Sequence, residues 1–283
     1  MPLPDLDALR GWIGRTESDS DIAAPGPAAL LAATLNRDRA PEAGDLLPIT
    51  WHWLYFLSPT ASRDLSEDGM PRRGSFMPPV PLPRRMWAGS RIEIRQPIRL
   101  GDRLRRRTTI ADIKGKEGRS GALIFVRVLT EIDTDRGLAI VEQRDIVFRD
   151  HPSHAASTST PAESPAADAL WREEMAAGTV LLFRYSALTF NPHRIHYDQR
   201  YSTEVEGYPA LVVQGPLLAT LLAEALANRL PAASIRTITF RAASAIFVDE
   251  RFALAGRNDA HRAVAWAAKG DNRVAMTAEA EIG

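Results

Sequence analysis

The segment FNPHRIHYD, residues 190 to 198, holds two of the chain's six histidines together with an arginine and an aspartate. An imidazole has an unperturbed pKa of about 6.5, so it takes up and returns protons near neutral pH. Proton transfer by such a group typically accelerates a reaction by about 10²- to 10⁴-fold. We therefore interpret His196 as the candidate acid–base residue, with His193 as the alternative. Asn191 is the side chain that would hold a water or fix the loop.

A strongly apolar helix is predicted shortly after this segment, over residues 214 to 230 (QGPLLATLLAEALANRL). Pro216 suits the first turn of a helix, where a missing N–H costs nothing. The leucines that follow leave only a narrow polar edge, so this helix is expected to be buried. The positive end of a helix favours an anion. The N–H of Gly215 is therefore the candidate donor to a developing oxyanion, and one such donor is worth roughly 10²- to 10³-fold in rate.

These elements resemble the motif of the MaoC-like hydratase and dehydratase superfamily, in which Asn-Pro precedes a histidine and an acid, and a glycine begins the next helix. The matching residues here are Asn191-Pro192, His196, Asp198 and Gly215. The segments FRYSALTFNPHRIHYD, GPLLATLLAE and MPPVPLPRRMWAGSRIEI are similar to the hydroxyacyl-thioester dehydratase type 2 branch of that superfamily. The resemblance covers nearly the whole chain.

The chain departs from the superfamily pattern at the acid. Two residues before Asn-Pro, where the superfamily has a catalytic Asp, this chain has Thr189, which would donate a hydrogen bond instead. His193 and Arg194 are extra residues between Asn-Pro and the Ile-His pair. The acid partner of His196 therefore stays open, and for Asp198 a capping role competes with a chemical one.

The resemblance implies an α+β double hot-dog fold, with two antiparallel sheets each wrapped on a long central helix, either separate or merged into one extended sheet. It implies reversible hydration or dehydration of an enoyl-CoA or 3-hydroxyacyl-CoA thioester. Coenzyme A would be part of the substrate, and no separate cofactor is expected. The alternatives are a 3-hydroxyacyl-thioester dehydratase of lipid metabolism, a hot-dog thioesterase, and an acyl-CoA binding module.

Arginines are concentrated in residues 71 to 107, which contain eleven of them against Glu93 and Asp102. Guanidinium groups suit the phosphates of coenzyme A and the extra carboxylate of a dicarboxylic acyl group. This favours a short branched dicarboxylic substrate such as mesaconyl-CoA or itaconyl-CoA. Even spacing along a strand is also typical of a solvated face. Arg84 and Arg85, in a proline-rich loop, escape that explanation and are candidate substrate-binding residues.

Other side chains have competing interpretations. His193, His196 and Asp198 have the residue types of a metal site, but Pro192 disfavours a helical pairing of the two histidines, so no metal is expected. His52, within the aromatic run WHW, is either a hydrogen-bonded core residue or part of the acyl pocket. Arg194 is a further candidate for substrate binding.

Alternating apolar and polar residues predict strands within 91–113, 121–132 and 137–149 of the first half, and within 234–256, 261–270 and 272–282 of the second. Residues 151–170 are rich in Ala, Ser, Thr and Pro and read as a flexible linker. We therefore predict an N-terminal hot-dog unit over 1–150, which shapes the acyl pocket and carries ligand-binding loops, and a catalytic unit over 171–283. In the first unit, 27–37 and 47–57 are the helical candidates, although a strand is also compatible with the second.

Composition limits the remaining possibilities. The chain has 283 residues, no cysteine, and 35 Lys plus Arg against 35 Asp plus Glu, which excludes thiolate chemistry and gives no sign of a nucleic-acid or membrane partner. We expect a soluble cytoplasmic protein. Hot-dog units commonly pair, so a homodimer is expected unless the two units complete each other within one chain.

Overall fold

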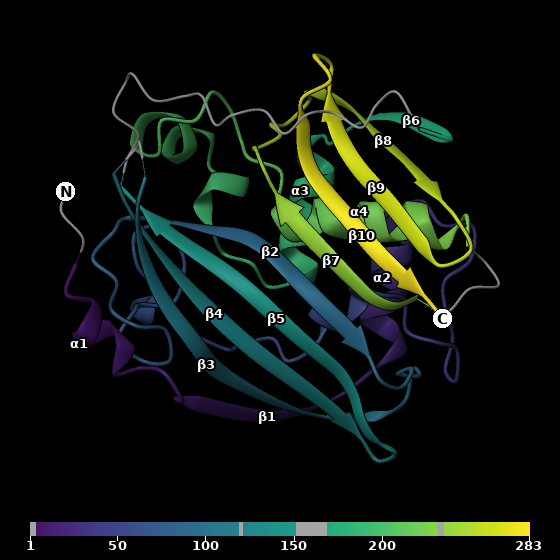
Figure 1. Cartoon of the computed structure of the whole chain (residues 1–283), viewed down its shortest axis with the longest axis horizontal. Coiled ribbons are helices and arrows are strands. Elements are labelled where there is room, and N and C mark those ends of the chain that lie inside the picture. The colour runs from purple at the N-terminus through teal and green to yellow at the C-terminus, as the bar shows by residue number, and fades with distance from the viewer. Residues whose placement is uncertain (1–3, 119–120, 151–168, 231–234) are drawn as a thin grey trace.

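The computed structural model describes residues 4–118, 121–150, 169–230 and 235–283, and Figure 1 shows how they are arranged. The first half contributes the strands β1 (Thr16–Ile22), β2 (Arg84–Ile94), β3 (Arg103–Gly118), β4 (Gly121–Thr134) and β5 (Gly137–Arg149). The second half contributes β6 (Trp171–Ala176), β7 (Ile235–Ala242), β8 (Arg251–Asn258), β9 (Arg262–Lys269) and β10 (Val274–Ile282). The strands predicted from alternation are therefore confirmed.

All ten strands belong to one antiparallel sheet in the order β1-β3-β4-β5-β2-β7-β10-β9-β8-β6. The two halves meet where β2 pairs with β7, from Gly89 opposite Arg241 to Glu93 opposite Thr237. A Cβ on Gly89 would overlap the backbone carbonyl oxygen of Phe240, so only glycine allows this close approach. The merged form of the double hot-dog sheet is the one observed.

The two halves share one local arrangement. In each, an edge strand is followed by a ten-residue helix, α2 (Pro25–Thr34) or α3 (Thr179–Leu188). In the first half, the N–H of Gly101 (φ 102°) donates to the carbonyl of Ala23 over 2.8 Å. In the second, the N–H of Asp249 (φ 59°) donates to the carbonyl of Ala177 over 3.1 Å. The same left-handed turn thus holds both helices against the sheet.

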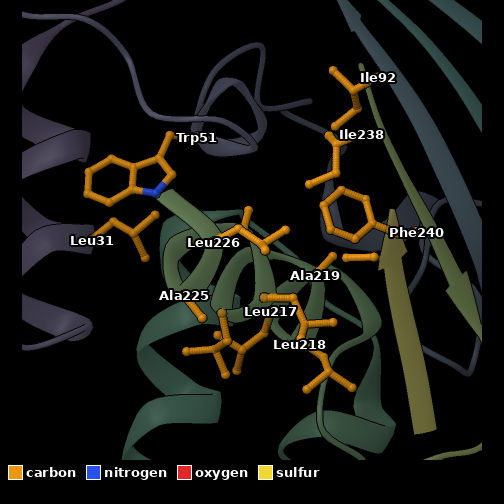
Figure 2. Close-up of a cluster of buried hydrophobic side chains, with 14 of the residues drawn as sticks. Leu31, Trp51, Ile92, Leu217, Leu218, Ala219, Ala225, Leu226, Ile238 and Phe240 are labelled. Carbon is orange, nitrogen blue, oxygen red and sulfur yellow. The ribbon is translucent and has the colours of Figure 1, made fainter. Parts of the chain in front are cut away.

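The main core lies between the sheet and the 13-residue helix α4 (Gly215–Ala227), which is apolar nearly all round (Figure 2). Leu217, Leu222 and Ala219 on this helix are fully buried. They belong to one cluster with Ile238 and Phe240 of β7. The prediction of a buried helix over residues 214–230 is confirmed, since α4 begins at Gly215 and is buried in the core.

The prediction of a helix over residues 47–57 is wrong for most of that range. Only η1 (Trp51–Leu54) forms, as a single 3₁₀ turn preceded by Thr50 in the left-handed region. The aromatic side chains find tertiary partners instead: the Trp51 Nε1 donates to Glu224 over 3.0 Å, and the Tyr55 hydroxyl donates to the carbonyl of Ala24 over 2.7 Å. Among the residues of the first half that the structure describes, no helix corresponds to α4.

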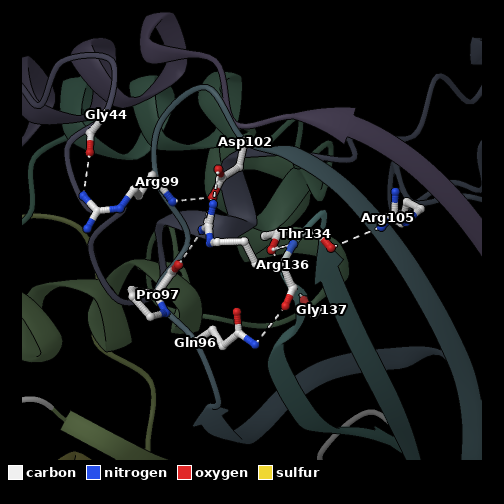
Figure 3. A network of polar contacts seen from close by, with 9 residues as sticks. All are labelled: Gly44, Gln96, Pro97, Arg99, Asp102, Arg105, Thr134, Arg136 and Gly137. Carbon is white, nitrogen blue, oxygen red and sulfur yellow. Dashed lines mark hydrogen bonds and ion pairs between the residues drawn. The ribbon is translucent and has the colours of Figure 1, made fainter.

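Polar contacts stabilise the β2–β3 loop and the β4–β5 turn of the first half (Figure 3). Arg136 forms two bonds to the carboxylate of Asp102, at 2.8 and 2.7 Å, and a third to the carbonyl of Pro97. The bond from Arg136 holds the pKa of Asp102 below its usual value. Arg99, next to this pair, is exposed and reaches the carbonyl of Gly44. These arginines tie strand turns together.

Short elements complete the fold: α1 (Leu6–Arg10), η2 (Ser62–Asp64), η4 (Arg194–His196) and η5 (Tyr201–Val205). Of the predicted linker, all but Ala169 and Leu170 lies outside the described residues. In the part of the chain that is described, no helix is both long and apolar enough to cross a bilayer.

Candidate active site

His196 is held by its neighbours in a definite protonation pattern. Its Nδ1 lies 2.7 Å from the carbonyl oxygen of Val212, and the N–H of Val212 donates to the carbonyl of Ile195 over 2.9 Å. A carbonyl only accepts, so Nδ1 carries the proton and Nε2 presents its lone pair. Val212 stands three residues before Gly215, which limits their Cα separation to about 10 Å. The ring of His196 is therefore held by the segment that leads into α4.

His193 accompanies His196 at this site. The two rings meet edge to face, with 5.5 Å between their centroids. They are only 8% and 7% exposed, and Nε2 of His193 is buried without a hydrogen-bond partner. A buried polar atom with no protein partner is uncommon, so this nitrogen is a candidate to bind a polar group of the substrate.

Burial lowers the pKa of His196 to about 4, and the hydrogen bond to Val212 only partly opposes it. Burial also lowers the pKa of His193 to about 3; the charges of His196, Arg85 and Arg84 act in the same direction, whereas that of Asp68 opposes them. Both imidazoles are therefore neutral at physiological pH. Neutral rings are able to accept a proton from water.

The first N–H groups of α4 are candidates to bind an anion. No side chain caps the helix, so its first N–H groups have no partner within it. A Cβ on Gly215 would lie 2.8 Å from Cε3 of Trp87, a residue of β2. The Nε1 of Trp87 and the Oε1 of Gln214, next to this glycine, are buried and unpaired. Glycine is required here because the indole ring lies directly against the helix start.

Two further residues of the motif tie down the loop. The Oδ1 of Asn191 accepts from the N–H of His193 over 3.1 Å, which fixes the turn before the histidines. The hydroxyl of Thr189 donates to the carbonyl of Tyr185 over 2.8 Å, at the end of α3. Asn191 thereby positions His193, and Thr189 secures the end of the preceding helix. Direct chemical roles for them stay predictions.

Asp198 and Arg194 bind each other. Both Nε and Nη2 of Arg194 donate to Oδ2 of Asp198, at 3.0 and 2.6 Å, and Oδ1 accepts from the N–H of Tyr201 over 3.0 Å. The guanidinium of Arg194 also stacks on the ring of Tyr201. Asp198 therefore caps η5, and His193, His196 and Asp198 do not converge. Nowhere among the described residues do three or more His, Asp or Glu gather in a way that could hold a metal ion.

The prediction that Arg84 and Arg85 lie in a loop is wrong, because they are the first two residues of β2, and their surroundings differ. Arg84 is buried, bonds to Oε2 of Glu206 over 2.9 Å and stacks on Tyr208 at 4.3 Å. Arg85 is partly buried, and no hydrogen bond or ion pair is recorded for it within the described ranges. Burial lowers the pKa of Arg85 to about 10. Of the two side chains, Arg85 is the one whose charge has no partner.

His52 is a hydrogen-bonded core residue, which confirms one of the two interpretations of this side chain. Its Nε2 lies 3.0 Å from Oε2 of Glu142, which also accepts from Nε1 of Trp53 over 3.0 Å. Ser90 donates to the other oxygen of Glu142 over 2.7 Å. Burial alone would raise the pKa of Glu142, but the charge of Arg144 and these hydrogen bonds hold it well below its usual range. Contact of His52 with an acyl group stays a prediction.

Sequence reasoning missed Asp68, an acid from the first half that lies at the catalytic loop. Its backbone carbonyl accepts from the N–H of Arg194 over 2.9 Å, and Oδ1 accepts from the N–H of Met70 over 2.9 Å. A Cβ on the following Gly69 would overlap the carbonyl of Pro192. The Asp-Gly pair signals a turn, but nothing local signals its place beside the histidines.

A cleft of about 540 Å³ lies at the other end of α4, lined in part by Arg37, Glu224 and Asn228. Nε of Arg37 bonds to Glu224 over 2.6 Å, and its guanidinium stacks on Trp51. Two charged groups that line this cleft, Arg37 and Glu224, are therefore paired with each other. It is separate from the histidine site, which lies at the N-terminal end of the helix.

Comparison with known proteins is consistent with this geometry. Residues 50–248 match the family model of hydroxyacyl-thioester dehydratase type 2. The chain is 43% identical over 273 residues to a mesaconyl-C(4)-CoA hydratase of Chloroflexus aurantiacus, covering 96% of this chain and 97% of that one. A solved MaoC-like dehydratase superposes with a TM-score of 0.72 at 13% identity, covering 97% and 99% of the two chains. A Mycobacterium tuberculosis protein with a double hot-dog fold gives a TM-score of 0.59 at 12% identity, covering 99% and 98%.

Proposed function

The chain belongs to the hydroxyacyl-thioester dehydratase type 2 family, and from that premise we propose that it hydrates a mesaconyl-type enoyl-CoA reversibly. It is a hydro-lyase, which adds water across a double bond conjugated to a thioester. The near full-length similarity to the Chloroflexus hydratase supports a short branched dicarboxylic acyl group. A mesaconyl or itaconyl group has that character.

The reaction assigns a task to each end of the site. Nε2 of His196 takes a proton from water, whose oxygen then bonds to the β-carbon of the enoyl group. The electron pair of the double bond moves toward the thioester, and the N–H of Gly215 at the start of α4 stabilises the enolate oxygen. The imidazolium returns its proton to the α-carbon. The reverse sequence eliminates water.

One observation carries this proposal: Val212 accepts from Nδ1 of His196 immediately before the chain enters α4. That bond leaves Nε2 as the basic nitrogen and connects the base to the segment that supplies the oxyanion donor. His193 is the second imidazole of the site, and its unpaired Nε2 suits a hydrogen bond to substrate or to the attacking water.

The test separates hydration from hydrolysis. Incubation of the protein with enoyl-CoA thioesters is expected to remove the conjugated absorbance without release of free thiol. Release of free thiol would identify a thioesterase. No change in either the conjugated absorbance or the free thiol would leave an acyl-CoA binding module. Including a linear medium-chain enoyl-CoA in the panel tests the lipid-metabolism alternative, because such a dehydratase would prefer it.

We also propose a division of labour between residues 1–150 and 171–283. The second part supplies His193, His196 and Gly215, while the first covers them with Asp68 and Trp87. A homodimer and a cytoplasmic location are further proposals, supported by the habits of hot-dog units and by the absence of cysteine from the sequence.

A further inference from the structure

The eleven arginines of residues 71–107 differ sharply in what they bind. Five form ion pairs with carboxylates: Arg84, Arg95, Arg105, Arg106 and Arg107. Four donate to backbone or hydroxyl oxygens: Arg72, Arg73, Arg91 and Arg99. Of the two others, Arg103 is exposed and only Arg85 is partly buried. The local positive excess is thus largely neutralised, and Arg85 is the exception.

Arg85 lies on the side of the sheet that faces the site. It sits in β2 opposite Phe148 and two residues before Trp87, and side chains two apart on a strand point to the same face. Trp87 lies against the start of α4, as the 2.8 Å approach at Gly215 shows. The charge of Arg85 also acts on His193, whose pKa it helps to lower. The guanidinium is therefore near both the helix start and the histidine pair.

A partly buried guanidinium without a partner is costly. Taking a charge out of water costs several kcal/mol unless an opposite charge compensates it. No acid lies within ion-pair distance of Arg85 among the described residues; Asp68 acts on it only at longer range. The cost would be recovered when an anion binds. A carboxylate matches the planar fork of a guanidinium and accepts two parallel bonds.

A mesaconyl thioester carries such an anion on a carbon that reacts. When coenzyme A is attached at C4, the free carboxylate stands on the β-carbon, the atom that receives the water. A group that binds this carboxylate must lie next to the base. A negative charge on that carbon also opposes attack by the water oxygen, and a cation paired with it removes the opposition.

We propose that Arg85 is the residue that selects a dicarboxylic acyl group, by pairing its guanidinium with the free carboxylate on the β-carbon of the enoyl thioester. This inference rests on the proposed hydratase function. It assigns different tasks to adjacent arginines: Arg84 locks the loop that carries Glu206, and Arg85 binds substrate.

The test compares two substrates that differ at one group. Mesaconyl-C4-CoA carries a carboxylate on the β-carbon, and 3-methylcrotonyl-CoA carries a methyl group there. The wild type is expected to prefer the first in kcat/KM. In Arg85→Gln, the ratio of the two kcat/KM values is expected to fall by roughly 10²-fold or more, because the carboxylate loses a buried charged partner. Arg85→Lys keeps the charge but not the fork and should give a smaller fall.

The stability of the ligand-free protein distinguishes binding from a structural role. Removing an unpaired, partly buried charge should leave the Tm of Arg85→Gln unchanged or raise it, whereas loss of a structural bond would lower it. Arg149 is the matched control. It is also partly buried with no recorded bond in the described chain, but in β5 it pairs with Arg84 and so faces the other side of the sheet. Arg149→Gln should keep the wild-type substrate ratio.

The outcomes are distinct. If Arg85→Gln or Arg85→Lys hydrates the two thioesters in the wild-type ratio, or if Arg149→Gln changes that ratio as strongly, the assignment of Arg85 is overturned while the hydratase function stands. A lower Tm together with equal losses on both substrates would overturn it in favour of a structural role. If the wild type hydrates no enoyl thioester, the proposed function itself fails.

Discussion

His193 and His196 show that local sequence identifies a chemical group but not its protonation. Both histidines could be selected from their spacing after Asn-Pro. Their low pKa values arise from burial and, for His193, also from charges that include the distant Arg85 and Arg84 of β2. For the same reason Asp68 was not predicted, because its proximity to His193 depends on tertiary contacts alone. Short motifs therefore predict candidates, and packing decides how they behave.

The buried histidines make the stability of the protein depend on pH. In the unfolded chain their pKa is about 6.5, whereas in the folded protein it is about 4 for His196 and about 3 for His193. Between these values the unfolded chain binds protons that the folded chain excludes. The free energy of unfolding should therefore decrease as the pH falls through this window and be fully retained above about pH 6.5.

Urea unfolding at about pH 7 and about pH 5 measures this effect. His196→Asn, which keeps a donor for the Val212 carbonyl, should lose less stability between the two pH values than the wild type. His261→Asn, at an exposed turn, should keep the wild-type dependence. An unchanged pH dependence in His196→Asn would contradict the buried, neutral state of this ring.

The apolar pattern of the sequence predicts the helix α4 correctly but predicts the structure around η1 wrongly. In α4 the leucines and the Gly-Pro start agree with the buried helix that forms. Residues 47–57 are as apolar, but Thr50 adopts a left-handed conformation, and the indole and phenol groups bond to α4, β5 and the loop before α2. Tertiary partners thus outweigh helix propensity.

The start of α4 should not tolerate a side chain at Gly215. Gly215→Ala would place its Cβ 2.8 Å from the Trp87 ring, so the ring or the helix start must move. A displacement of about 1 Å in a positioned group can cost about 10²-fold, and we expect a loss of this order in kcat. The measurement is steady-state hydration by the variant.

Gly26→Ala is the control for this change. Gly26 lies in the first turn of α2, and a Cβ there meets nothing within 4 Å. It should keep wild-type kcat, and because Gly26 precedes Pro27 we expect no gain in stability from the added Cβ. Equal activity of the two variants would show that the Gly215 position is not part of the reaction.

The loop that follows the histidines depends on the Arg84–Glu206 pair. Both side chains are nearly inaccessible, at 6% and 5% exposure. Glu206→Gln would leave the Arg84 charge buried without a carboxylate and should cost about 3–5 kcal/mol in urea unfolding. The double variant Arg84→Met/Glu206→Leu should recover most of this loss. A double variant as unstable as Glu206→Gln would show that the unpaired Arg84 charge is not the cause of the loss.

At the scale of the whole molecule, one sheet joins the two halves into a single site. Eight of the ten strands were predictable from alternation within each half, whereas the largely polar edge strands β1 and β6 were missed. The pairing of β2 with β7 was not predictable, because antiparallel neighbours that are distant in sequence carry no local signal. Both edge strands, β1 and β6, expose carboxylates such as Asp19 and Glu174, which disfavours addition of a further strand. The site depends on the central seam because Trp87 and Gly215 belong to different halves.

Gly89→Ala tests this dependence. Its Cβ would overlap the Phe240 carbonyl, which is backbone and has no way to rotate aside, so β2 and β7 must separate. We expect a loss of about 1–3 kcal/mol in stability, accompanied by a lower kcat. Gly270→Ala, at the end of β9 where a Cβ meets nothing within 4 Å, should change neither. Full activity in Gly89→Ala would show that the halves work independently.

The central claim is that His196 delivers water to the β-carbon of an intact thioester. Mass spectrometry after turnover of mesaconyl-C4-CoA in H₂¹⁸O measures this directly. We predict a CoA thioester product that carries ¹⁸O in a new β-hydroxyl group, formed by the wild type and reduced about 10²- to 10⁴-fold in His196→Asn. Label found only in a released carboxylic acid, or undiminished β-labelling in His196→Asn, would contradict the account.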